Sequence, residues 1–189
     1  MRKALFLDRD GVINKMVTKY SKSYGRVMED TPFNISELRF NEGIEELLRF
    51  AERMGYFPVI VTNQPSLVKE NILLKDYEEV TKEICTRLGL RRAQVFECFH
   101  KEGFTLECDC RKPKPGLFLM AKGMFDLDLE NSVMIGDSYT DIQAAQNAGV
   151  KKTIYLRRDP ENEKEMKAKG IYPSESVNTL SEVIQNGLL

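Results

Sequence analysis

The sequence has almost no net charge and no long apolar run. Its 189 residues contain 28 Lys and Arg against 29 Asp and Glu, a formal charge of −1 at pH 7. A domain that binds nucleic acid is expected to be basic, and this chain is not, so we expect no nucleic-acid partner. No apolar stretch approaches the about 20 residues of a membrane span, so we expect no membrane association. The apolar run Ala4–Leu7 is too short for the core of a secretory signal, and we expect a cytoplasmic protein.

Histidine occurs once and cysteine four times, and most of these residues lie close together. Three thiols and one imidazole form a Cys₃His set that is typical of a closed, structural zinc site: Cys98, His100, Cys108 and Cys110. The one-residue spacing turns both ligands of each pair to one side of an extended chain. Reduced core thiols beside a lone histidine, or a disulfide, are the alternatives, although cytosolic disulfides are rare. We expect a zinc-binding loop over residues 98–110, and Cys85, remote in sequence, as a core residue.

The remaining pattern alternates apolar β-type runs with amphipathic helical stretches. At this length and 42% hydrophobic content, one domain over residues 1–189 is the default. Strands are expected over residues 4–7, 57–62, 94–99, 132–137 and 152–156, with helices over 44–54, 75–88, 117–124, 142–148 and 179–184. This βα alternation predicts an α/β fold with a doubly wound parallel sheet and helices on both faces.

Two carboxylates, Asp8 and Asp10, follow the first apolar run, and Gly11 comes directly after them. Side chains two apart in an extended chain share a side, so the pair can converge at the carboxyl end of the strand. Carboxylates about 4 Å apart repel by about 4 kcal/mol, which a bound cation would offset. One or two carboxylates with room for a phosphate suit Mg²⁺. Asp8 is then a candidate nucleophile and Asp10 a candidate acid/base; a capped acidic turn is the alternative.

Other polar side chains stand at the ends of later strands. The hydroxyl of Thr62 can reach a phosphoryl oxygen with help from Asn63, although strands favour threonine anyway. Asp137 follows Gly136 and is the expected third Mg²⁺ ligand. Asp141 either supports it or pairs with a helix dipole.

A basic turn with two prolines, residues 111–116, follows the proposed zinc loop. Its Lys112 can neutralise the acids and hold a transferring phosphoryl group, and Arg111 can bind a second phosphate or sugar oxygens. A solvated basic turn is the alternative. A long loop is expected over residues 15–41, and its basic residues Lys15, Lys19, Lys22 and Arg26 either contact an anionic substrate or lie on a solvated surface.

The stretch Asp8-Arg9-Asp10-Gly11-Val12-Ile13 resembles the first motif of the haloacid dehalogenase (HAD) superfamily of phosphatases, and the similarity continues over about residues 3–158. Cys98-Phe99-His100 and Cys108-Asp109-Cys110-Arg111-Lys112-Pro113 resemble the small, capless branch that removes the 7-phosphate of D-glycero-D-manno-heptose 1,7-bisphosphate, with its histidinol-phosphatase relatives. The resemblance implies Asp8 as nucleophile and Asp10 as acid/base, with Thr62 and Lys112 on the phosphoryl group. It also implies Arg111 on the substrate and Mg²⁺ on Asp8, the Asp10 carbonyl and Asp137.

Two segments depart from this branch: the long loop 15–41, and residues 65–71 in place of a Ser-Gly loop ending in Arg-Gly. Both lie where substrate is expected to be recognised. We therefore expect a monomeric, Mg²⁺-dependent phosphatase for a small phosphorylated sugar, foremost the heptose bisphosphate. The alternatives are a histidinol-phosphate phosphatase and, from another class, a non-catalytic zinc-containing binding module.

Overall fold

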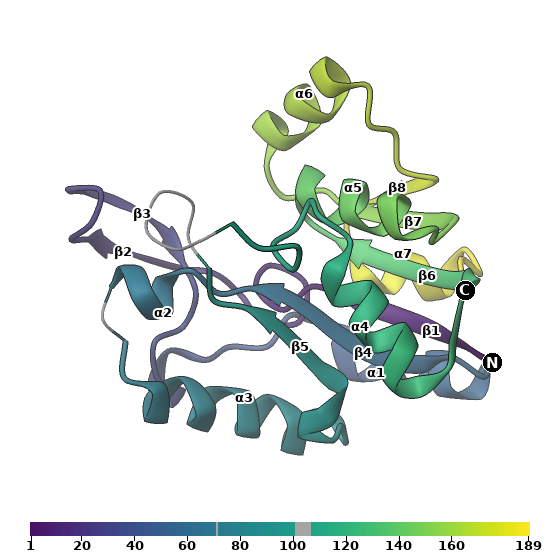
Figure 1. Cartoon of the computed structure of the whole chain (residues 1–189), viewed down its shortest axis with the longest axis horizontal. Coiled ribbons are helices and arrows are strands. Elements are labelled where there is room, and N and C mark those ends of the chain that lie inside the picture. The colour runs from purple at the N-terminus through teal and green to yellow at the C-terminus, as the bar shows by residue number, and fades with distance from the viewer. Residues whose placement is uncertain (71, 101–106) are drawn as a thin grey trace.

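A six-stranded sheet forms the centre of the molecule (Figure 1), and a computed structural model describes it together with its surroundings over residues 1–70, 72–100 and 107–189. Its strands, in spatial order, are β5 (Val95–Cys98), β4 (Phe57–Asn63), β1 (Arg2–Leu7), β6 (Leu127–Gly136), β7 (Lys152–Leu156) and β8 (Glu175–Val177). Every neighbouring pair is parallel. The predicted α/β fold with a parallel sheet is confirmed.

Helices cover both faces of this sheet. One face packs on α1 (Ile44–Arg53), α3 (Leu74–Leu88) and α7 (Leu180–Gln185), and the other on α4 (Gly116–Phe125) and α5 (Tyr139–Ala148). Successive residues of β1 feed the two cores in turn, so both of its faces are buried, as its uninterrupted apolar run predicts. The other helices in the described part of the chain are α2 (Ser66–Lys69), α6 (Pro160–Lys169) and two 3₁₀ turns, Ile35–Glu37 and Arg92–Gln94. Among the described residues, no helix is long and apolar enough to cross a membrane.

The segment 15–41 is more ordered than its expected loop. It contains an antiparallel hairpin of β2 (Val17–Ser21) and β3 (Arg26–Asp30), which projects from the body of the molecule (Figure 1). The sequence of β2 does not show the alternation of apolar and polar residues that indicates a strand, because its more buried positions include Lys19. Its ammonium pairs with Glu37 at 2.6 Å and lies 3.4 Å from the ring centroid of Phe33. A lysine buried in this way breaks the apolar alternation by which strands are recognised.

The register of the central strands brings the predicted site residues to one edge. Leu7, the last residue of β1, lies beside Ile60 of β4 and Ile135 of β6. The chain leaves β1 toward β4 on one side and later returns to β6 on the other, so this edge is a topological switch point, where α/β proteins bind their ligands.

Candidate active site

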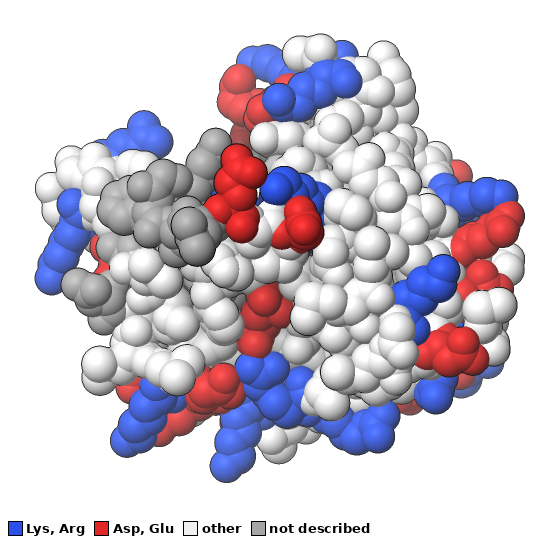
Figure 2. Space-filling view, in the orientation of Figure 1, with Lys and Arg blue, Asp and Glu red and all other residues white. Residues whose placement is uncertain are grey.

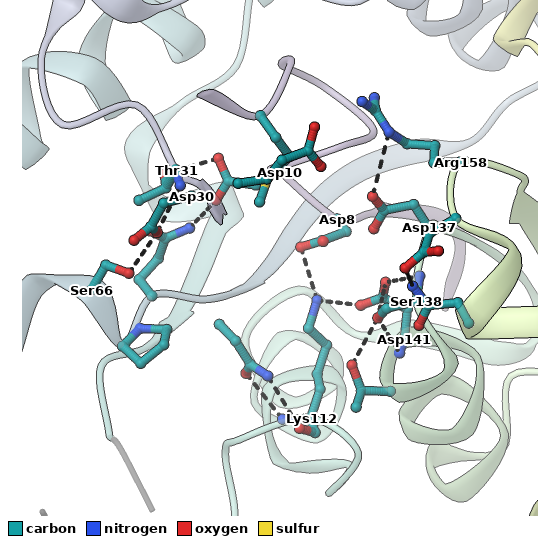
Figure 3. A pocket seen from close by; sticks show the side chains of 18 of the residues that line it. Asp8, Asp10, Asp30, Thr31, Ser66, Lys112, Asp137, Ser138, Asp141 and Arg158 are labelled. Carbon is teal, nitrogen blue, oxygen red and sulfur yellow. Dashed lines mark hydrogen bonds and ion pairs between the residues drawn. The ribbon is translucent and has the colours of Figure 1, made fainter. Parts of the chain in front are cut away.

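A cavity of about 420 Å³ opens at the carboxyl ends of β1, β4 and β6. Asp8, Asp137 and Asp141 meet in it, each offering one carboxylate oxygen within 4.8 Å of the others (Figure 3). Asp8 follows β1, Asp137 follows β6, and Asp141 stands in the first turn of α5. The structure thus brings together the acids that the sequence placed at two separate strand ends.

Two glycines make room for these acids. Gly11 has a φ of +93°, which favours glycine, and a Cβ there would overlap the carboxylate of Asp137. A Cβ on Gly136 would overlap the side chain of Asp141. The glycine after Asp10 and the glycine before Asp137 are therefore required by the close approach of side chains from distant parts of the chain.

The acids are buried, and this changes their proton affinity. Burial and the neighbouring Asp141 raise the pKa of Asp8 to about 7, against the lowering effect of Lys112. Burial and the charges of Asp8 and Asp141 raise the pKa of Asp137 well above its ordinary value. Like charges packed this closely favour protonation unless a cation compensates them. The donor set, carboxylate oxygens beside an open cavity, fits Mg²⁺.

Lys112 supplies a fixed cation to the cluster. Its ammonium lies 2.9 Å from Asp8 Oδ1 and 2.5 Å from Asp141 Oδ1, and it donates to the Val61 carbonyl at 2.8 Å. Burial alone would lower the pKa of Lys112, but the carboxylates of Asp141 and Asp8 raise it. Its backbone is fixed as well, because Asn63 exchanges two hydrogen bonds of 3.1 Å with the Lys112 N–H and C=O. Asn63, predicted to contact substrate, lines the cavity and also holds this lysine.

Asp10 lines the same cavity, but its carboxylate is turned toward a different set of partners (Figure 3). It pairs with Arg9 at 3.0 Å and accepts hydrogen bonds of 2.9 Å from Asn14 and Thr31, and one from Gln64. Burial alone would raise the pKa of Asp10, whereas Arg9 and the hydrogen bonds from Asn14 and Gln64 bring it below its ordinary value. The carboxylate of Asp10 is thus separate from the cluster around Asp8, and any contribution to a metal would come from its carbonyl oxygen.

Thr62 and Arg111 occupy different positions relative to the cavity. Thr62 is buried, does not line the cavity, and accepts a hydrogen bond of 2.9 Å from Gln64. Arg111 lines the cavity and donates to the His100 carbonyl at 3.1 Å.

Arg158 also lines the cavity, and sequence reasoning missed it. Its guanidinium lies 3.9 Å from Asp137 Oδ2 and donates to the Gly11 carbonyl at 2.8 Å. The available signal was its position just after the strand 152–156, whose carboxyl end reaches the same edge.

The four predicted zinc ligands lie together, each offering an atom within 4.8 Å of the others. Cys98 Sγ is 3.8 Å from Cys108 Sγ and 3.2 Å from Cys110 Sγ, and His100 Nδ1 is 3.5 and 3.3 Å from Cys98 and Cys110. Zn–S bonds of about 2.3 Å in a tetrahedron require S–S separations of about 3.8 Å, whereas a disulfide requires about 2.05 Å. The donor set fits Zn²⁺, and the cysteines are free thiols. Residues 101–106 of the expected loop lie outside the described residues.

Comparisons with known proteins agree on the family. A HAD-hydrolase-like family model matches residues 109–183. A D-glycero-alpha-D-manno-heptose-1,7-bisphosphate 7-phosphatase of Campylobacter jejuni is 37% identical over 161 residues, 83% of this chain and 84% of that protein. The D-glycero-beta-D-manno-heptose-1,7-bisphosphate 7-phosphatase of a Helicobacter pylori strain is 38% identical over 162 residues, 84% and 86% of the two chains.

Solved structures show the same fold. A HAD-like phosphatase of Mesorhizobium loti superposes with a TM-score of 0.74 at 24% identity, covering 97% of this chain and 85% of that one. The D,D-heptose 1,7-bisphosphate phosphatase of B. bronchiseptica, complexed with magnesium and phosphate, superposes with a TM-score of 0.71 at 24% identity and 98% coverage of both chains. With the acid cluster and its lysine at the carboxyl edge of the sheet, the chain belongs to the HAD-type phosphatase family that includes the heptose-1,7-bisphosphate 7-phosphatases, and it is a phosphomonoester hydrolase.

Proposed function

We propose that this chain removes one phosphate from a small phosphorylated sugar in an Mg²⁺-dependent reaction that passes through a phosphorylated Asp8. The observation that carries the proposal is the meeting of Asp8, Asp137 and Lys112 in one cavity. The relatives at 37% and 38% identity are named for the 7-phosphate of D-glycero-D-manno-heptose 1,7-bisphosphate, and we propose that substrate here. The reading as a non-catalytic zinc module is set aside because these relatives are phosphatases.

Asp8, Asp137 and the Asp10 carbonyl oxygen are the groups that we propose hold Mg²⁺. When bound, this ion offsets the repulsion between the carboxylates and draws electron density from the phosphoryl oxygens. Asp141 lies in the same cluster, but its oxygens are taken by Lys112 at 2.5 Å and by the Ser138 hydroxyl and N–H at 2.7 and 3.0 Å. It therefore fixes Lys112 and the start of α5.

The chemistry uses two carboxylates in separate roles. An oxygen of Asp8 attacks phosphorus, and the bond from phosphorus to the sugar oxygen breaks. Asp10 gives a proton to that departing oxygen and then takes one from the water that hydrolyses the phosphorylated Asp8. Its low pKa in the free protein suits the second step. For the first step, the negative phosphate brought beside it raises its proton affinity. Lys112 stays against Asp8 and stabilises the charge that develops on the phosphoryl oxygens.

Arg111 is the residue that we propose recognises the second phosphate. Among the described residues, two other cations line the cavity, Lys112 and Arg158, and they already face Asp8, Asp141 and Asp137. A charge-assisted hydrogen bond contributes about 1.5–3 kcal/mol, or roughly 10- to 100-fold in affinity. A bisphosphate therefore gains a contact here that a monophosphate lacks.

A second set of acids supports the histidinol-phosphate alternative. Glu29, Asp30 and Asp159 also line the cavity, besides the cluster around Asp8. Carboxylates suit a leaving group that carries an ammonium or hydroxyl groups. These additional lining acids are the specific observation that favours the second candidate.

Phosphate release from a panel of three substrates tests the proposal: the heptose 1,7-bisphosphate, the heptose 7-phosphate and histidinol phosphate, each with Mg²⁺. We expect the bisphosphate to have the highest kcat/KM, and Arg111→Met to lower that value about 10- to 100-fold. Lys114→Met, a neighbouring lysine with a half-exposed side chain, is the control and should change it by less than about threefold. A preference for histidinol phosphate would favour the second candidate, and release from none of the three would contradict the phosphatase proposal.

Zinc removal gives a prediction for the Cys98–Cys110 segment. We propose that zinc on the four ligands pins the start of the turn that carries Arg111 and Lys112. Because four protein ligands leave no open position, its role is structural. After chelation and return of excess Mg²⁺, backbone hydrogen exchange should become faster at residues 98–100 and 107–115. The kcat/KM should fall by about tenfold, because Arg111 and Lys112 lose the contacts that orient them.

Cysteine variants separate zinc from general thiol chemistry. Cys108→Ala should reproduce the effect of chelation, whereas Cys85→Ala, in the core face of α3, should keep the zinc content and kcat/KM of the parent. Full activity in protein shown by metal analysis to be free of zinc would count against the pinning role.

A further inference from the structure

Arg9, which lies between the two acids of the first motif in sequence, is a fully buried arginine. Arg9 has 0% exposure, and it does not line the cavity. Its Nη2 donates to Asp10 Oδ2 at 3.0 Å, to Gln64 Oε1 at 2.8 Å and to the Thr31 hydroxyl, and its Nε lies 3.3 Å from Asp10 Oδ2. Arg9 thus binds the Asp10 carboxylate from the interior of the protein. It is too buried to bind the phosphate that the cavity receives.

Burying a cation is costly, and the surroundings of Arg9 offset that cost in two ways. Asp10 supplies the opposite charge, and the ring of Tyr77 from α3 lies with its centroid 5.1 Å from the Arg9 guanidinium carbon. The electron-rich face of an aromatic ring attracts a cation. Arg9 Nη1 has no hydrogen-bond acceptor among the described residues, so the attraction of the Tyr77 ring is needed to offset part of the cost of burying this cation.

The ring is itself fixed by contacts from a second element. Tyr77 has 2% exposure, and its hydroxyl donates to Glu97 of β5. Glu97 in turn pairs with Arg92 at 2.5 Å. The Tyr77 ring also packs against Phe99 in a T-shaped arrangement, with centroids 5.3 Å apart. The residues that support Arg9 therefore connect α3 to the end of β5. They lie next to Cys98, the first cysteine of the proposed zinc cluster.

We propose that Arg9, packed against the Tyr77 ring that Glu97 holds in place, is a positioning residue that holds the Asp10 carboxyl group in line with the departing sugar oxygen. The inference rests on the proposed function, in which Asp10 donates a proton to that oxygen. A planar guanidinium binds a carboxylate in a fixed orientation, whereas a lysine ammonium does not fix the orientation. Without Arg9 the Asp10 carboxyl group loses this fixed orientation, and proton transfer to a departing oxygen requires such an orientation.

The dependence of rate on the leaving group tests this role. A sugar alkoxide is a poor leaving group and needs the proton of Asp10, whereas p-nitrophenolate leaves without it. For Arg9→Met we expect kcat/KM to fall about 100-fold with a sugar phosphate, the scale of general acid catalysis, and less than about fivefold with p-nitrophenyl phosphate. Tyr77→Leu should act in the same direction at about tenfold, and Tyr77→Phe, which keeps the ring, should restore most of the loss.

Two further measurements keep the test sharp. The Mg²⁺ affinity of Arg9→Met, measured by titration calorimetry, should stay within about threefold of the parent, because the guanidinium contacts the carboxylate of Asp10 and not the carbonyl oxygen that we propose as a ligand. Arg87→Met, an exposed α3 arginine that pairs with Glu45, is the matched control and should leave the ratio of the two kcat/KM values unchanged. If Arg9→Met does not fold, Arg9→Lys and Tyr77→Leu carry the test.

The outcomes separate this inference from the proposed function. A parent enzyme that hydrolyses neither compound contradicts the function itself. A parent that hydrolyses both, with variants that lower both values equally, leaves the function standing and overturns the positioning role of Arg9.

Discussion

Replacing Asp8 by asparagine is expected to lower phosphate release by about 10⁴-fold or more, because an amide oxygen does not attack phosphorus as a carboxylate does. The loss should appear in kcat with every substrate, since the same residue forms the phosphorylated intermediate each time. It should also weaken Mg²⁺ binding, because Asp8 is one of the proposed ligands. Initial rates with the best substrate of the panel, followed over a Mg²⁺ titration, measure both effects.

The fold of this variant is expected to survive. Burial and the neighbouring Asp141 raise the pKa of Asp8 to about 7, so a neutral side chain of the same shape relieves repulsion, and Lys112 keeps its ion pair with Asp141. Thermal unfolding without added Mg²⁺ should therefore give a melting temperature at or above that of the parent. Asp126→Asn, an exposed carboxylate at the opposite end of β1, should leave the rate unchanged. Turnover of the Asp8 variant at the parent rate would contradict the mechanism.

The acid cluster could be predicted because parallel strands align their ends. Asp8 and Asp137 are far apart in sequence, but each follows an apolar run that reads as a doubly covered strand, and such runs end at one edge of the sheet. The strand over residues 152–156 and the helices over 44–54 and 75–88 follow the same periodic logic and are confirmed to within a residue or two. Local pattern and global topology agree in this part of the chain.

Side-chain direction could not be predicted in the same way. Alternation along an extended chain placed Asp8 and Asp10 on one side, but Gly11 turns the backbone at a φ of +93°, and Arg9 draws the Asp10 carboxylate away from the cluster. Arg158 has no motif of its own. Its role comes from the spacing of β6 and β7 in the sheet, which no local pattern records.

The two segments that depart from the related branch turn out to touch each other. The Ser66 hydroxyl donates to Asp30 of the hairpin at 2.7 Å. Glu70 accepts from the Ser21 hydroxyl at 2.6 Å and from the Lys22 N–H at 3.2 Å. The two departures are therefore neighbours in the structure, although the residues in contact lie between 36 and 49 positions apart in the sequence. Asp30 and Ser66 both line the cavity, so the contact between the two segments forms part of its lining.

Replacing Lys112 by methionine is expected to reduce both catalysis and stability. The lysine is one of the fixed charges on the transferring phosphoryl group, and loss of one such donor costs about 10²- to 10³-fold in kcat. Removing one partner of a buried ion pair also costs about 3–5 kcal/mol in the free energy of unfolding, because Asp8 and Asp141 are left without their common cation. Lys114→Met, two residues along the same turn, is the matched control and should change neither quantity appreciably.

The stability loss in Lys112→Met should depend on pH in a direction fixed by the carboxylates. The pKa of Asp8 in the parent is about 7, raised from 3.8, so the folded state keeps its proton over a range of pH in which the unfolded chain has lost it. Stability from this group is present below about pH 4 and is lost as the pH rises through 7; without the lysine the pKa rises further. Urea unfolding without added Mg²⁺ should thus show a larger loss at pH 8 than at pH 5. An equal loss at the two pH values would mean that Lys112 acts through packing, and that the acids around it are compensated by another group.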